Sequence, residues 1–133
     1  MPQALRPIRT DFQGWIWRGL IALLFVYIGW GKFDDAPSSE WVKIFARIGL
    51  GQWFRVLTGV VEVGGGVLYL FPKTNRVGAA LLASAMLGAM IVHVAVLHDP
   101  ILIIAPLALL AAVVVVAVRD PSLDLIARRY RSD

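Results

Sequence analysis

A single carboxylate interrupts a long apolar stretch of the sequence. Glu62 is the only charged residue in GVVEVGGGVLYLF, residues 59–71. An ionised carboxylate in hydrocarbon is costly, so it needs either a partner or a proton. Glu62 is therefore the first candidate for chemistry, because a carboxyl group can bind a polar ligand or relay a proton. The alternative is a structural hydrogen bond between two helices.

Four other polar side chains fall near Glu62 if the apolar stretches are helices. At a rise of about 1.5 Å per residue, Lys32, Arg55 and His93 reach one level, about 10 Å above Glu62. Thr58 falls between the two levels. We expect a polar cavity with a cationic mouth, in which Glu62 is paired or protonated. Taken singly, Lys32 and Arg55 are favoured to snorkel to lipid headgroups over serving a site, and His93 either contacts the ligand or anchors the interface.

Two aromatic residues complete the predicted ligand pocket. Tyr27 and Trp30 lie near the end of the first apolar stretch and could stack on a flat ring, although they also suit an interfacial aromatic belt. The predicted pocket residues are Glu62, His93, Lys32, Arg55, Thr58, Tyr27 and Trp30. No catalytic residue and no metal site is predicted. The chain has no cysteine, which excludes thiolate, zinc–thiolate and iron–sulfur chemistry from its own side chains.

The elements that must position these residues are four apolar stretches, at about residues 15–33, 52–71, 77–97 and 101–118. Each is close to the roughly 20 residues that a helix needs to cross a bilayer. The stretches do not alternate as barrel strands do. The chain is 59 % apolar, above the roughly 45–50 % of soluble domains, and its mean hydropathy is +0.73. The sequence predicts one all-α transmembrane domain over residues 1–133, a four-helix bundle.

Helical spacing predicts which face of each stretch packs against protein. Residues at steps of three and four form a stripe of small and polar side chains, so Glu62 should face a neighbouring helix. Glycines on such a stripe let helices approach closely. The second stretch carries Arg55, Thr58, Gly59, Glu62, Gly65, Gly66 and Tyr69, the first carries Arg18, Ala22, Phe25, Gly29 and Lys32, and the third carries Ala85, Ala89 and His93.

The first loop contains a short amphipathic helix in PSSEWVKIFARIG, residues 37–49. Ser38 is the expected N-cap. One face is apolar and the other charged, which is typical of a helix lying at a membrane interface. The helix is either a lid over the bundle or a connector resting on lipid. The apolar face comprises Trp41, Ile44, Phe45 and Ile48, and the charged face comprises Glu40, Lys43 and Arg47.

The basic residues predict the orientation. The net charge is +4, and the basic residues lie beside apolar stretches, which favours a role in topology over nucleic-acid binding. Both termini are expected in the cytoplasm and Asp34–Gly51 outside. The inner flanks then carry Arg6, Arg9, Arg18, Lys73, Arg76, Arg119, Arg128, Arg129 and Arg131, against Lys32, Lys43, Arg47 and Arg55 on the outer flanks.

Three segments together resemble the DoxX family of small bacterial membrane proteins: GWGKF, VEVGGG and FPKTNRVGAALLASAMLGAMIVHV. The resemblance covers nearly the whole chain and implies a four-helix bundle in the bacterial inner membrane. Some members are subunits of thiosulfate:quinone oxidoreductases, and others are linked to thiol and oxidative-stress systems. The positions that match are Gly29, Lys32, Glu62, Gly65, Arg76, Gly78 and His93.

The function predicted from residues and resemblance is a quinone-linked or redox-associated subunit that binds a small ligand around Glu62. The chain has no haem-ligand pair at a convincing depth and no flavin or dinucleotide motif, so a bound quinone or a partner would be the redox centre. A small anionic ligand also suits a cationic mouth. The alternatives are a non-catalytic anchor or assembly protein, acting with a partner or as a homodimer, and a small-solute or lipid-binding protein.

Overall fold

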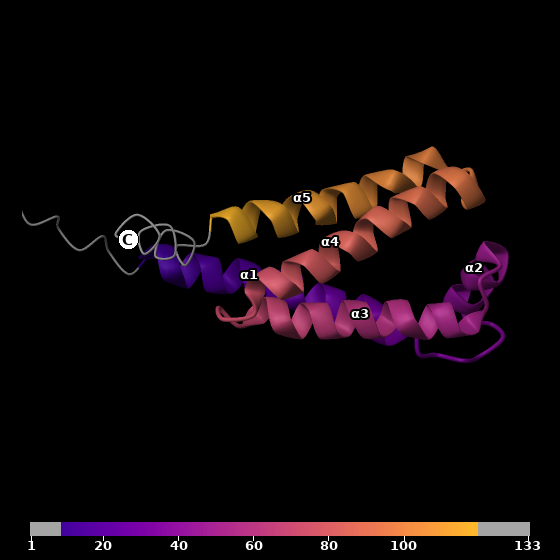
Figure 1. Ribbon diagram of the computed structural model, residues 1–133, viewed down its shortest axis with the longest axis horizontal. Helices are drawn as coiled ribbons and strands as arrows, with labels where there is room; N and C mark the ends of the chain where they lie inside the picture. Colours follow the sequence, from indigo (N-terminus) through magenta and orange to yellow (C-terminus); the bar gives the residue numbers. More distant parts are fainter. Residues whose placement is uncertain (1–8, 120–133) are drawn as a thin grey trace, which may run out of the picture.

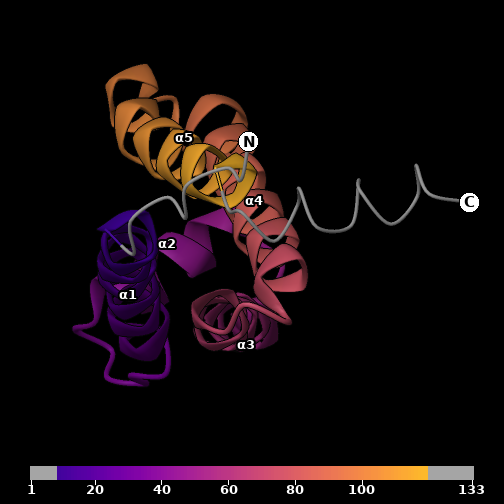
Figure 2. The same ribbon diagram turned by 90° about the vertical axis from the view of Figure 1, so that its left-hand side faces the viewer.

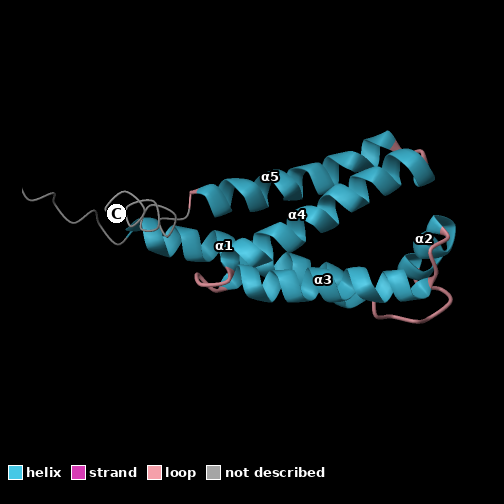
Figure 3. Cartoon of the chain, viewed as in Figure 1, coloured by secondary structure: helices cyan, strands magenta, loops and turns pink. Residues whose placement is uncertain are grey.

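The computed structural model describes residues 9–119, and in this range every regular element is helical (Figure 3). Two short helical turns join α4 to α5: a π-helical turn at His93–Leu97 and a 3-10 turn at Pro100–Ile103. Figure 1 shows the helices, which are α1 (Arg9–Gly31), α2 (Glu40–Ile48), α3 (Gln52–Leu70), α4 (Asn75–Val92) and α5 (Ile104–Val118).

Four helical segments are long and apolar enough to cross a membrane, and this confirms the predicted all-α four-helix architecture. Their bounds agree with the predicted stretches to within a few residues. The predicted cytoplasmic location of both termini stays a prediction. The segments are Phe12–Gly31, Gln52–Leu70, Asn75–Leu97 and Pro100–Val118.

Helices α1 and α3 pack side by side through glycine. A Cβ atom at Gly29 would lie 2.9 Å from the Glu62 Cβ and 3.0 Å from the Gly59 carbonyl oxygen. Close approach of this kind is what small residues permit at helix interfaces in membranes. The stripe predicted on α3 is buried almost throughout, so Glu62 faces protein as expected. The stripe predicted on α1 is buried as well, from Arg18 to Lys32.

Helices α3 and α4 cross at Gly78 and then diverge. A Cβ atom at Gly78 would lie 2.3 Å from the backbone nitrogen of Tyr69 and 2.7 Å from the Gly65 carbonyl oxygen. From this crossing the two helices separate toward the end where α2 lies (Figure 1). The Tyr69 hydroxyl donates a hydrogen bond to the Val113 carbonyl oxygen at 3.0 Å, which ties α3 to α5.

Helix α2 lies across the open end of this wedge. It contacts α3 and the π-helical turn after α4, and an end-on view shows it across the space between the four long helices (Figure 2). Its N-cap is Ser39, without a side-chain capping bond, so the predicted cap at Ser38 is wrong by one residue. Adjacent serines cap a helix equally well, and spacing alone does not separate them. Gly49 ends the helix in the left-handed conformation, φ 80°.

Candidate functional site

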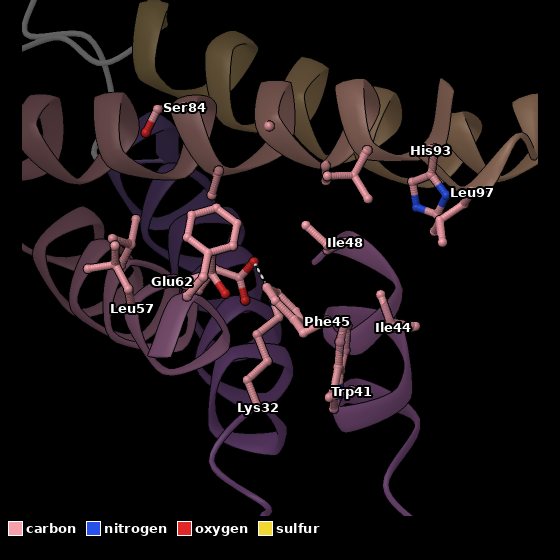
Figure 4. A pocket seen from close by; sticks show the side chains of 17 residues that line it. Lys32, Trp41, Ile44, Phe45, Ile48, Leu57, Glu62, Ser84, His93 and Leu97 are labelled. Carbon is pink, nitrogen blue, oxygen red and sulfur yellow. Dashed lines mark hydrogen bonds and ion pairs between the residues drawn. The ribbon is translucent and has the colours of Figure 1, made fainter. Parts of the chain in front are cut away.

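A cavity of about 300 Å³ lies in the wedge between α2, α3 and α4, and Lys32, which directly follows α1, also lines it (Figure 4). Apolar side chains from three helices form most of its wall. The whole predicted apolar face of α2 lines it, which favours the lid over the lipid-resting connector. These α2 residues are Trp41, Ile44, Phe45 and Ile48.

A buried ion pair holds Glu62 in place. The Lys32 ammonium donates to Glu62 Oε1 at 2.6 Å, and the two side chains are only 7 % and 3 % exposed. The predicted height difference of about 10 Å is too large, because Gly29 lies level with Glu62 and Lys32 follows Gly29 by only three residues, a rise of about 4.5 Å. The lysine side chain bridges this shorter distance. The ion pair also shows that Lys32 is not a snorkelling residue. Two opposite charges buried at contact distance strongly stabilise each other, and each would be costly alone.

The ion pair leaves hydrogen-bonding atoms without partners at a mostly apolar cavity. Glu62 Oε2 is buried and has no hydrogen-bond partner among the described residues, and the same holds for Nδ1 of His93. The Lys32 ammonium has three N–H donors, of which Glu62 uses one. Buried polar atoms in proteins are nearly always satisfied, so each exception calls for an explanation. An apolar pocket with a few convergent polar groups is the usual form of a small-molecule site.

Aromatic rings cover the ammonium group. The Lys32 Nζ atom lies 4.8 Å from the ring centre of Trp41 and 5.9 Å from that of Phe45. A cation over an aromatic face is attracted by the ring quadrupole, more strongly in a desolvated place. Helix α2 therefore closes the cavity directly above the ion pair, with rings that could also face a planar ligand.

Arg55 is buried beside the cavity and does not line it. Its guanidinium donates to the backbone oxygens of Lys32 and Asp34 and to the Asp35 carboxylate, and Nε donates to Gln52 at 2.7 Å. Arg55 is only 2 % exposed, so snorkelling is wrong for it as well. Gln52 in turn donates to the backbone oxygen of Val42 in α2 at 3.1 Å. Arg55 thus fixes the end of α1, and through Gln52 it is linked to α2.

The structure brings four of the seven predicted pocket residues together. Thr58 lines the cavity with Lys32, Glu62 and His93, and its hydroxyl donates to the Arg55 carbonyl oxygen at 2.9 Å. Tyr27 and Trp30 lie outside the cavity lining and are 77 % and 69 % exposed, as lipid-facing or interfacial aromatic residues would be.

Sequence reasoning did not place several lining residues in the pocket, among them Phe54, Ser84 and Gly88. For α2, the amphipathic spacing correctly predicted which residues form the apolar face. The spacing did not predict that this face covers a cavity. Within residues 9–119, no three His, Cys, Asp or Glu side chains are grouped so that they could hold a metal ion.

Comparison with known proteins identifies the family. The DoxX-like family matches residues 16–116 of the chain. A protein of Bacillus subtilis (strain 168) named "Putative oxidoreductase CatD" is 28 % identical over 74 residues, which is 56 % of this chain and 54 % of that protein. The chain thus aligns with about half the length of this relative. No solved structure matches it. With four helices apolar enough to span a bilayer, this chain is a multi-pass membrane protein that belongs to the DoxX-like family.

Proposed function

We propose that the protein is a redox-associated membrane subunit that binds the head group of a quinone in the cavity around Glu62. The observation that carries the proposal is the buried Lys32–Glu62 ion pair, which lines an apolar cavity and in which the second carboxylate oxygen has no partner among the described residues. A quinone head has the complementary form, because it is a flat apolar ring with polar oxygens at its edge.

The two members of the ion pair suit the two redox forms of such a ligand. A quinone carbonyl accepts hydrogen bonds, and the Lys32 ammonium has donors left to give. A quinol hydroxyl donates hydrogen bonds, and Glu62 Oε2 is an acceptor without a described partner. Glu62 is also the group that could take up or release a proton when the ligand changes its oxidation state. The ring itself would lie against Trp41 and Phe45.

The charge and size of the cavity favour a neutral, ring-sized ligand. Lys32 is already neutralised by Glu62 at 2.6 Å, so the pocket offers no uncompensated lysine to a small anion. A volume of about 300 Å³ is at the lower end of ligand pockets, which suits a single ring. The chain has no cysteine, so in a redox reaction the electrons would pass between the quinone and a partner. The name of the similar Bacillus subtilis protein, "Putative oxidoreductase CatD", supports the proposed redox role.

Mass spectrometry of the protein extracted from its native membrane tests the proposal. We expect quinone at close to one molecule per chain after purification in mild detergent, because a ligand buried on most sides dissociates slowly. Extraction of a variant in which Lys32→Met and Glu62→Leu are combined serves as the control and should lose the quinone. A wild-type protein that retains only a phospholipid, or only a partner protein, would contradict the proposal and favour lipid binding or assembly instead.

A further inference from the structure

The cavity has an edge on the outer surface of the bundle, between α3 and α4. Leu57 and Val61 are one turn apart on α3, and Ser84 and Gly88 are one turn apart on α4. All four line the cavity, while Leu57, Ser84 and Gly88 are also exposed. We call these four residues the rim. Figure 4 shows Leu57 on α3 and Ser84 on α4 facing each other across one side of the cavity, with Glu62 next to Leu57.

The rim lies within membrane-spanning segments and not at a loop. Its residues fall in the interiors of the spans Gln52–Leu70 and Asn75–Leu97, where the outer surface of a bundle faces hydrocarbon. The loop-side end of the cavity is covered by α2. The Ser84 hydroxyl donates to the Leu81 carbonyl oxygen of its own helix at 2.7 Å, so the rim is compatible with lipid.

The rim is open at Gly88. A Cβ atom added at Gly88 would meet no atom from outside its own stretch of helix within 4 Å. Glu62 also lines the cavity, is only 2 % exposed, and has an Oε2 atom without a partner among the described residues. The cavity thus joins a buried polar group to a rim that is exposed at the level of the lipid tails.

We infer that the ligand is dissolved in the membrane and carries a long apolar tail, which leaves the cavity through the rim while the head group lies at Glu62. This inference rests on the proposed function and specifies its substrate class: a tailed quinone, in preference to a soluble ring compound. A ligand of that form suits both the buried ion pair and the exposed rim, because only its head group is enclosed and its tail stays in hydrocarbon.

Gly88→Leu tests the inference, because it places a branched side chain where the tail would pass. Gly64→Leu is the matched control: Gly64 also has open space around its Cβ position, yet it does not line the cavity. The purified proteins are titrated with two probes. One is decylubiquinone, and the other is the same head group without a tail. We expect Gly88→Leu to weaken decylubiquinone binding by at least about tenfold, roughly the loss of burial of two methylene groups. The tail-less probe should bind both variants and the wild type alike.

The outcomes separate the two proposals. Unchanged decylubiquinone binding by Gly88→Leu, with both probes binding the wild type, would overturn the rim and leave the proposed function standing. Binding of neither probe to the wild type would overturn both. A quinone with a photoreactive group on its tail gives a readout that needs no variant. It should label residues 57–61 and 84–88, and labelling confined to α1 or α5 would contradict the inference.

Discussion

Gly78→Ala, which adds a single methyl group, should be one of the most destabilising substitutions in this bundle. We expect the free energy of unfolding to fall by about 3 kcal/mol. The added Cβ would lie 2.3 Å from the backbone nitrogen and 2.6 Å from the Cα of Tyr69. These are backbone atoms, which cannot rotate away as a side chain would. The helices α3 and α4 would have to move apart at the crossing on which the shape of the cavity depends.

Gly64→Ala is the matched control for this prediction. A Cβ at Gly64 would meet nothing within 4 Å, and alanine is the better helix former by up to about 1 kcal/mol. Thermal or denaturant unfolding in detergent should therefore rank Gly64→Ala level with the wild type or above it, and Gly78→Ala far below. If the two variants unfold together, the close crossing at Gly78 is not present in the protein.

Glu62→Leu alone should destabilise the protein by about 3–5 kcal/mol, because it leaves the Lys32 ammonium buried without its carboxylate. Adding Lys32→Met should recover most of this loss, since replacing both members of a buried ion pair by apolar residues is often nearly neutral. A double-mutant cycle in unfolding experiments measures the coupling between the two residues.

The exposed ion pair on α2 is the control for the cycle. Lys43 Nζ lies 2.7 Å from Glu40 Oε1, with side chains 54 % and 77 % exposed. Exposed pairs of this kind contribute less than about 1 kcal/mol, so the same replacements there should show little coupling. Equal coupling in the two pairs would mean that Lys32 and Glu62 are not buried together.

The direction in which Glu62 points was predictable, because the period of a helix fixes which residues share a face. The same argument correctly grouped Glu62 with Gly59 and Gly65 on the buried side of α3. The partner of Glu62 was not predictable in the same way. Rise per residue places Lys32 and Arg55 at one height only if the ends of the spans are level, and the packing of Gly29 against Glu62 sets Lys32 about one turn from Glu62 instead. Rise also does not tell which side chain turns into the bundle and which turns toward a loop.

The second limit on prediction from the sequence was the environment of the apolar surfaces. Lipid and a pocket wall attract the same side chains, so the amphipathic pattern of α2 did not reveal whether Trp41 faces a bilayer or a cavity. The ambiguity also affected Tyr27 and Trp30, which are aromatic residues near the end of a span and could have met a ligand or the membrane interface. The divergence of α3 and α4 from their close crossing at Gly78 creates the space that α2 covers, and the sequence pattern does not reveal that divergence.

Titration of the tail-less ubiquinone head group against two doubly substituted proteins tests the central claim most directly. In one protein Lys32→Met and Glu62→Leu remove the buried pair, and in the other Lys43→Met and Glu40→Leu remove the exposed pair. Because both proteins should remain folded, any difference in binding reports on the cavity. The account predicts wild-type affinity when the exposed pair is removed and at least about a tenfold loss when the buried pair is removed, as the hydrogen bonds at the polar end disappear. Equal affinity in the two proteins would contradict a quinone site at Glu62.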